Sequence, residues 1–178
     1  VKFLINIAGE MKKINNSVKF IIAGEGIEYE NLILLSKKIN VLNDSVFFIA
    51  PIKKINIPIL YSKATIVTSL FINLKELQNN SANKFFDGLS AGKPVMINYS
   101  GWQRSILENN KAGFYLPYDD YKKSALILNK IILDKDLLKA MGVSAKNIAK
   151  KYFEIDVQYP KLKKIIYSSV INYKKHSF

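Results

Sequence analysis

The sequence has no cysteine, one histidine and one arginine among its 178 residues. Without cysteine the chain can form neither a disulfide nor a thiolate metal site, which excludes a small disulfide-stapled secreted scaffold. No window approaches the roughly 18 to 20 uninterrupted apolar residues that a membrane-spanning helix needs, and the first residues show no signal-peptide pattern. We therefore expect a protein of the reducing cytoplasm.

Acidic residues are also scarce, so 27 basic against 14 acidic side chains leave a net charge of +13. Three interpretations are open: a compositional bias, attraction to nucleic acid, or attraction to an anionic membrane. Arg104 is the only arginine, and the lysines accompany a surplus of Ile and Asn along the whole chain, which favours compositional bias. Base-specific readout favours arginine forks, so we expect no nucleic-acid partner and at most a peripheral contact with the inner face of the cell membrane.

What the sequence does contain is a regular alternation of short apolar runs and helical stretches. The runs suit strands of a parallel sheet covered on both faces, and they are predicted at 18–23, 46–49, 65–68, 95–98 and 114–116. Helices are predicted at 3–13, 29–39, 57–63, 83–91, 103–109, 122–133, 136–151 and 156–173. This order predicts one α/β domain of the doubly wound, Rossmann-like type with right-handed crossovers.

The first and the last predicted helices both indicate contacts with protein segments outside this sequence. The helix at 3–13 would normally follow a parallel strand, so we expect the first strand of the sheet to be absent and the chain to be a fragment. The last helix carries apolar residues such as Leu162, Ile166 and Val170 at helical spacing, with lysines on the other face. Such an amphipathic helix is expected to pack on something.

Gly24 and Gly26 follow an apolar run and precede a helix, a place where glycines let the backbone approach a phosphate or a nucleoside. A plain turn without a binding role is the alternative. The third glycine of a dinucleotide fingerprint is replaced by Tyr29, which counts against a nicotinamide dehydrogenase.

The segment 79–95 predicts a short helix with exposed backbone amides at its start. Ser81 is the predicted N-cap, Gly92 ends the helix, and Pro94 opens the next strand. Lys84, in the first turn, could reach an anion bound by these amides, and Asp87 lies about one turn further on. The alternatives are a merely solvated lysine and an aspartate that complements the helix dipole.

The sequence from Asp87 to Val95, DGLSAGKPV, resembles the retaining glycosyltransferases of the GT-B fold, family 4 type. In that family the C-terminal domain carries two glutamates, the first contacting the donor sugar and the second binding the ribose. They fall on Asn79 and Asp87, and both positions depart from the pattern. Asp keeps two acceptor oxygens with a shorter reach, whereas Asn loses the charge.

The stretch from Asn83 to Asp87, followed by Gly101 and Trp102, is similar to a subgroup that builds bacterial surface polysaccharides such as capsule or lipopolysaccharide. The resemblance implies a glycosyltransferase that moves a hexose or N-acetylhexosamine from a nucleotide-diphospho-sugar to a lipid-linked precursor, without a metal or other cofactor. It also implies a division into a nucleotide-sugar-binding domain, 1–155, and a C-terminal helix, 156–178, that crosses to an N-terminal acceptor-binding domain.

Transferred residue by residue, the resemblance assigns a catalytic part to Asn79 and Lys84. It assigns donor-nucleotide binding to Gly24, Gly26, Ser81, Ala82, Asn83, Lys84 and Asp87. Two alternatives remain at this point: a nucleotide-sugar epimerase of the same fold, and a non-catalytic module that binds a nucleotide or a polyanion. The family's arginine and lysine that grip the diphosphate precede Val1, so we expect activity only from a longer protein.

Overall fold

Five short apolar runs form parallel strands in the computed structural model, which describes residues 1–176 and the side chains of residues 1–171. One sheet pairs β1 (Phe20–Ala23) with β2 (Val46–Ile49), with Phe20 opposite Val46. The other has the order β3 (Val67–Ser69), β4 (Val95–Ile97) and β5 (Gly113–Tyr115). All five predicted strands are confirmed, with ends shifted by up to two residues.

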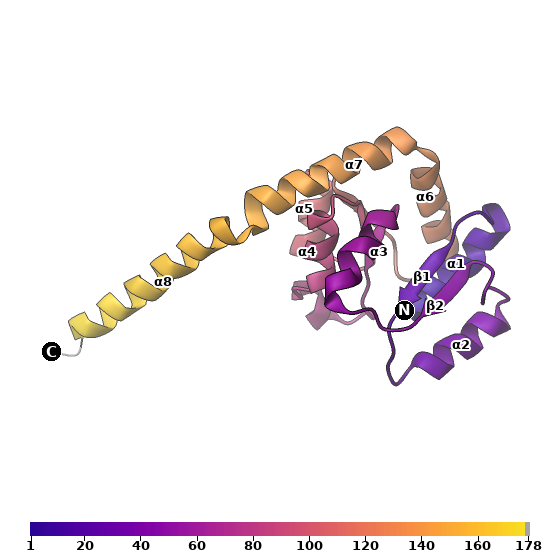
Figure 1. Ribbon diagram of the computed structural model, residues 1–178, viewed down its shortest axis with the longest axis horizontal. Helices are drawn as coiled ribbons and strands as arrows, with labels where there is room; N and C mark the ends of the chain where they lie inside the picture. The colour runs from indigo at the N-terminus through magenta and orange to yellow at the C-terminus, as the bar shows by residue number, and fades with distance from the viewer. Residues whose placement is uncertain (177–178) are drawn as a thin grey trace.

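Helices alternate with these strands, as the periodicity predicted, and all but the last lie around them (Figure 1). They are α1 (Lys2–Ile14), α2 (Tyr29–Lys38), α3 (Ile57–Lys63), α4 (Asn83–Ser90), α5 (Trp102–Asn109), α6 (Tyr121–Leu133), α7 (Lys135–Ile148) and α8 (Ile155–His176). The prediction missed two 3-10 turns, η1 (Lys54–Asn56) and η2 (Lys75–Asn79). It also ran α7 through a π-helical turn, η3 (Ala149–Phe153).

Two clusters of buried apolar side chains hold the layers together. One lies under both sheets and joins Ile7 of α1 to Val46 of β2, Met96 of β4 and Leu128 of α6. Because this cluster includes strands from both sheets, α1 and α6 tie the two sheets into one unit. The second cluster packs α4, α5 and α7 around β4, and its fully buried members include Phe85, Leu89, Val95 and Leu107.

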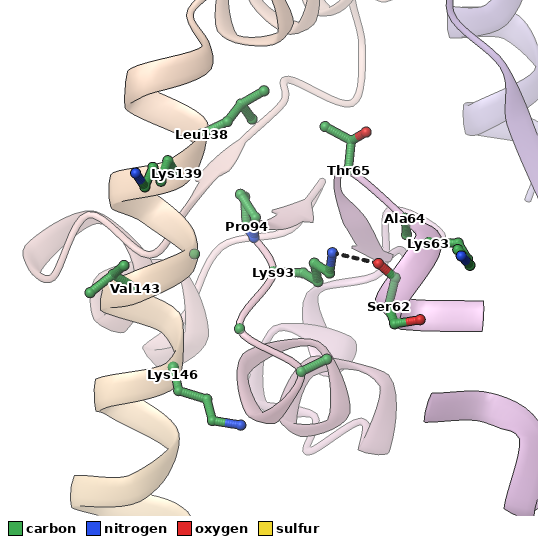
Figure 2. Close-up of a pocket in the computed structure, with 13 residues that line it drawn as sticks. Ser62, Lys63, Ala64, Thr65, Lys93, Pro94, Leu138, Lys139, Val143 and Lys146 are labelled. Carbon is green, nitrogen blue, oxygen red and sulfur yellow. Dashed lines mark hydrogen bonds between the residues drawn. The ribbon is translucent and has the colours of Figure 1, made fainter. Parts of the chain in front are cut away.

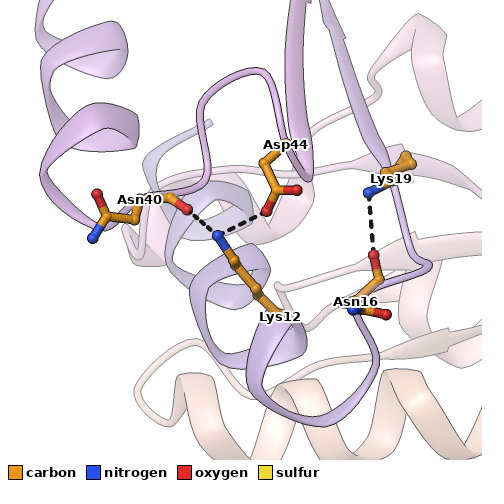
Figure 3. Close-up of polar contacts among 5 residues, drawn as sticks. All are labelled: Lys12, Asn16, Lys19, Asn40 and Asp44. Atoms are coloured by element: carbon orange, nitrogen blue, oxygen red, sulfur yellow. Dashed lines mark hydrogen bonds and ion pairs between the residues drawn. The ribbon is translucent and has the colours of Figure 1, made fainter.

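A polar contact fixes α1 to the turn between α2 and β2 (Figure 3). The Lys12 ammonium donates to the Asn40 carbonyl oxygen at 2.6 Å and pairs with the Asp44 carboxylate at 2.8 Å. Asn40 has a φ of +56°, a left-handed conformation that asparagine tolerates better than most residues. The hydrogen bond from Lys12 is the largest cause of the lowered pKa of Asp44.

Helix α8 leaves the rest of the protein and extends away from it (Figure 1). It follows η3 and packs on that turn. Its apolar side chains are largely exposed, among them Tyr159, Leu162, Ile165 and Ile166. No helix in the described part of the chain is both long and apolar enough to cross a membrane.

Candidate functional site

The carboxyl edge of the parallel strands carries the predicted glycine loop. In parallel α/β sheets, ligands bind in the crevice outside this edge. Gly24 directly follows β1 and, with Gly26, lines a hollow of about 570 Å³ whose other lining residues are Glu25, Tyr29, Ala50 and Pro51. Both glycines have positive φ, +139° and +153°, and space beside their backbone, so the loop shape depends on glycine at these two positions.

The start of α4 lies at the same edge, after β3 and the loop that follows it. Its N-cap is Ala82, and no side chain in the described part of the chain caps it. The prediction that Ser81 is the N-cap is therefore wrong. The Asn80 side chain instead shapes the turn before the helix, because its Oδ1 accepts from the Ala82 amide at 3.1 Å. This turn leaves Ser81 exposed rather than bound to the helix.

The end of α4 agrees with the prediction. Gly92 has a φ of +66°, its amide donates to the Leu89 carbonyl oxygen, and the Lys93 amide donates to that of Gly88. These two bonds form a Schellman motif, which needs a left-handed residue at the position of Gly92. The helix is therefore fixed at its end, while its start remains open.

The polar residues predicted for the site lie on the accessible side of this start. Asn79, which ends η2, and Ser81, Asn83, Lys84 and Asp87 are all exposed, while Ala82 is half-buried. None of them lines the glycine hollow. The structure therefore places the predicted residues at one edge of the strands as two groups, the glycine loop and the start of α4.

A charge effect connects Asp87 to a tyrosine on α3. Burial is the main cause of the raised pKa of the Tyr61 phenol on α3, and the negative charge of Asp87 raises it further. Tyr61, in the last turn of α3, thus lies on the side of α4 that carries Asp87. Sequence reasoning missed Tyr61, since a tyrosine in an apolar helix carries no separate signal.

A larger hollow, of about 670 Å³, lies at the opposite edge, where β3 and β4 begin (Figure 2). Four lysines line it, but Lys93 donates to the Ser62 carbonyl oxygen and Lys146 to that of Ser90, both at 2.9 Å. Lys63 and Lys139 point away from it (Figure 2). This hollow is distant from the predicted residues, so its size does not make it the functional site.

No three His, Cys, Asp or Glu side chains lie close enough together to hold a metal ion within the described residues. The charged groups that α4 presents at its start are Lys84 and Asp87. An ammonium beside open backbone amides suits an anionic ligand, and a carboxylate suits hydroxyl donors. Fold and site thus define a Rossmann-like α/β domain with a candidate ligand site at the carboxyl edge of its strands.

Comparison with protein families makes this more specific. The model for glycosyl transferases group 1 matches residues 1–148. The chain therefore belongs to the glycosyl transferases group 1 family. The family match favours the transferase interpretation over the epimerase and the non-catalytic module that the sequence left open. No curated protein matches the chain significantly.

Solved structures agree on the fold. HepE from Anabaena, in complex with UDP, superposes with a TM-score of 0.77 at 17% identity, over 92% of this chain and 44% of HepE. Its complex with UDP-glucose gives 0.77 at 18%, with the same coverage. The C-terminal domain of the group 1 protein LpcC from Francisella tularensis gives 0.72 at 16%, over 86% of this chain and 79% of that one.

This chain thus spans less than half the length of HepE. Its architecture is that of the C-terminal half of a GT-B glycosyltransferase, and the LpcC structure is that of such a C-terminal domain.

Proposed function

We propose that this domain binds the nucleoside diphosphate part of a nucleotide-sugar donor at the carboxyl edge of its strands. The observation that carries the proposal is the open start of α4, where free amides, Lys84 and Asp87 face the exposed side of the molecule. The family match and the UDP complexes of HepE support the same ligand class.

Each part of the donor has a group of matching chemistry. The hollow between Gly24, Gly26 and Pro51 would take the nucleoside, since backbone without side chains allows a flat ring to approach. The amides of Asn83 and Lys84, with the Lys84 ammonium, would hold the phosphates. Asp87 would accept from the ribose hydroxyls.

In sugar transfer, the anomeric carbon forms a bond to an acceptor hydroxyl oxygen, which gives up its proton, while the bond to the phosphate oxygen breaks and the nucleoside diphosphate leaves with added negative charge. Amides and an ammonium directed at that charge lower the barrier. Lys84 would act in this way, and Asn79 would orient the sugar by hydrogen bonds. The charge is then neutralised by the protein, and no metal is needed.

The wider role belongs to the same proposal. We propose a family 4-type retaining enzyme that transfers a hexose or N-acetylhexosamine to a lipid-linked precursor of a bacterial surface polysaccharide. The exposed apolar side chains of α8 would pack on an N-terminal acceptor-binding domain. The basic surface would then favour peripheral contact with the inner face of an anionic membrane.

Titration of the full chain with UDP, GDP, dTDP and ADP by calorimetry tests donor binding. We expect saturable binding of one of them at one site. Binding of none of the four, by a chain with a cooperative thermal unfolding transition, would contradict the proposal. Binding of all four with equal affinity and steep salt dependence would indicate a polyanion surface instead.

Substitution of Asp87 tests the ribose contact. We expect Asp87→Asn to weaken binding of the preferred nucleotide by roughly 1 to 3 kcal/mol, the range for loss of a charged hydrogen-bond partner. Asp136→Asn is the matched control, because Asp136 is an exposed aspartate in the first turn of a different helix, α7. Equal affinities of the two variants would exclude Asp87 from the site.

A further inference from the structure

The loop that leads into α4 is held from its buried side through one backbone atom. The carbonyl oxygen of Asn80 accepts from the indole N–H of Trp102 at 3.1 Å and from the side-chain amide of Gln103 at 3.3 Å. The Asn80 side chain binds within the loop, donating to the Leu77 carbonyl oxygen and accepting from the Ala82 amide. Asn80 thus connects helix α5 to the residues that precede α4.

Behind Gln103 runs a chain of buried hydrogen bonds. The Tyr99 hydroxyl donates to Gln103 Oε1, so its oxygen accepts the bond from Ser69 Oγ at 3.0 Å. A phenol is protonated at neutral pH, and burial raises the pKa of Tyr99 further, so its hydroxyl can donate. Ser69 ends β3, Tyr99 follows β4, and Gln103 is fully buried. The hydrogen bonds therefore connect the loop to the ends of strands β3 and β4.

These hydrogen bonds allow only one orientation of the Gln103 side-chain amide. With Oε1 of Gln103 occupied by Tyr99, its Nε2 must find an acceptor, and the Asn80 carbonyl oxygen supplies it. If the loop moved away, a buried amide would lose its partner, and an unsatisfied buried donor is costly. The network therefore opposes displacement of the loop.

Packing fixes the indole as well. The Trp102 ring lies 5.7 Å from that of Phe85 and 6.1 Å from that of Phe86, both in the first turns of α4, and 6.4 Å from Phe153 of η3. A methyl group on the preceding residue, Gly101, would collide with the Gln78 carbonyl oxygen. Trp102 thus contacts the start of α4 through its ring and the loop through its N–H.

We propose that Trp102 and Gln103 are positioning residues that hold the 79–82 loop and the open start of α4 in the conformation that receives the donor's phosphates and sugar. The inference rests on the proposed function. It gives the Gly-Trp pair a role behind the loop, exerted through the Asn80 carbonyl oxygen. Asn79, Ser81 and Lys84 on the exposed side depend on it for their placement.

Trp102→Phe and Gln103→Met test the inference in the full chain, since each removes the bond to Asn80 and keeps most of the buried volume. We expect amide hydrogen exchange at Asn80 and Ala82, whose amides bond to Leu77 and Asn80, to become roughly tenfold faster in both variants. We expect the Kd for UDP to rise roughly 3- to 10-fold, as for loss of one hydrogen bond. Exchange in β4 should not change.

Phe153→Leu is the matched control. It perturbs the same aromatic cluster, where Phe153 and Phe86 lie 4.9 Å apart, and none of its side-chain atoms bonds the loop. It should lower the Tm and leave both loop exchange and the Kd for UDP unchanged. If Trp102→Phe and Gln103→Met behave like this control, the inference is overturned.

The two hypotheses fail in different ways. Trp102 is the only tryptophan of the chain, so the fluorescence of the wild-type protein reports the environment of the indole that binds the loop. Wild-type protein that binds no nucleoside diphosphate would refute the proposed function, while the exchange measurements would still test the loop. A nucleotide that binds the wild type, with exchange and affinity unaltered in both variants, would refute the positioning role alone.

Discussion

Single residues explain why the start of α4 can serve as a site. Asn80, and not Ser81, makes the hydrogen bond that shapes the turn, so the side chains around it remain exposed. Lys84 and Asp87 lie on the accessible side of the helix, and Phe85 between them is completely buried. The helical period alone produces this division, because residues 84 and 87 share a face that residue 85 does not.

Asp44 gives a pH dependence at the same scale. Its pKa is lowered, so the folded state keeps the carboxylate charged where the unfolded chain takes up a proton. Its stabilising contribution is present above the ordinary value of about 3.9 and is lost as the pH falls through the lower, folded value. The contribution is small because the pair is exposed.

We expect wild-type protein to have a higher urea midpoint than Asp44→Asn near neutral pH, with the difference shrinking below about pH 4 and in high salt. Lys12→Met should remove the same dependence, because the Lys12 ammonium is the partner. A difference that stays constant from neutral to acid pH would show that the ion pair is not responsible.

At the scale of elements, the helices differ in how their first amides are satisfied. Asp120 caps α6 by accepting from the Lys123 amide at 2.8 Å, and Asp134 caps α7 by accepting from that of Leu137 at 2.8 Å. Helix α4 has no such cap in the described structure. Helices α1, α2, α3 and α5 likewise begin without a side-chain cap, so α4 is distinguished by the exposed Lys84 and Asp87 side chains and not by the missing cap alone.

Alanine substitution distinguishes the two kinds of helix start. Asp120→Ala should lower the free energy of unfolding by about 1 kcal/mol, the usual effect of losing an N-cap. Ser81→Ala should change it by less than about 0.5 kcal/mol, the range for an exposed site without a special contact. Urea unfolding measures both. A loss with Ser81→Ala as large as that with Asp120→Ala would restore Ser81 as the cap.

At the scale of the whole molecule, α8 is the helix whose apolar side chains the rest of the protein leaves exposed. Its exposed apolar residues lie along a helix that extends away from both cores (Figure 1). An exposed apolar surface of this extent marks an interaction surface. Alone in solution, the chain would have only another copy of itself to cover it.

We therefore expect the isolated chain to self-associate at high concentration. Leu162 and Ile166 are one helical turn apart and both more than half exposed, at 56% and 54%. The double substitution Leu162→Ser and Ile166→Ser should shift the mass measured by light scattering toward the monomer and leave the Kd for UDP unchanged. Lys163→Ser with Lys164→Ser is the control on the same helix. Equal association of both variants would exclude the apolar face as the cause.

The sequence by itself determined the parallel α/β fold and the order of its elements, because strand and helix periods, glycines and prolines act locally. It also placed Gly24, Gly26, Lys84 and Asp87 at strand ends or a helix start. The bond between Asn80 and the Ala82 amide is local, and the N-cap prediction missed it because Ser81 and Asn80 are both good turn residues. Only the tertiary structure decided that Trp102 and Gln103 bind the loop, because those bonds join residues 22 and 23 positions apart and no local pattern specifies which distant groups meet.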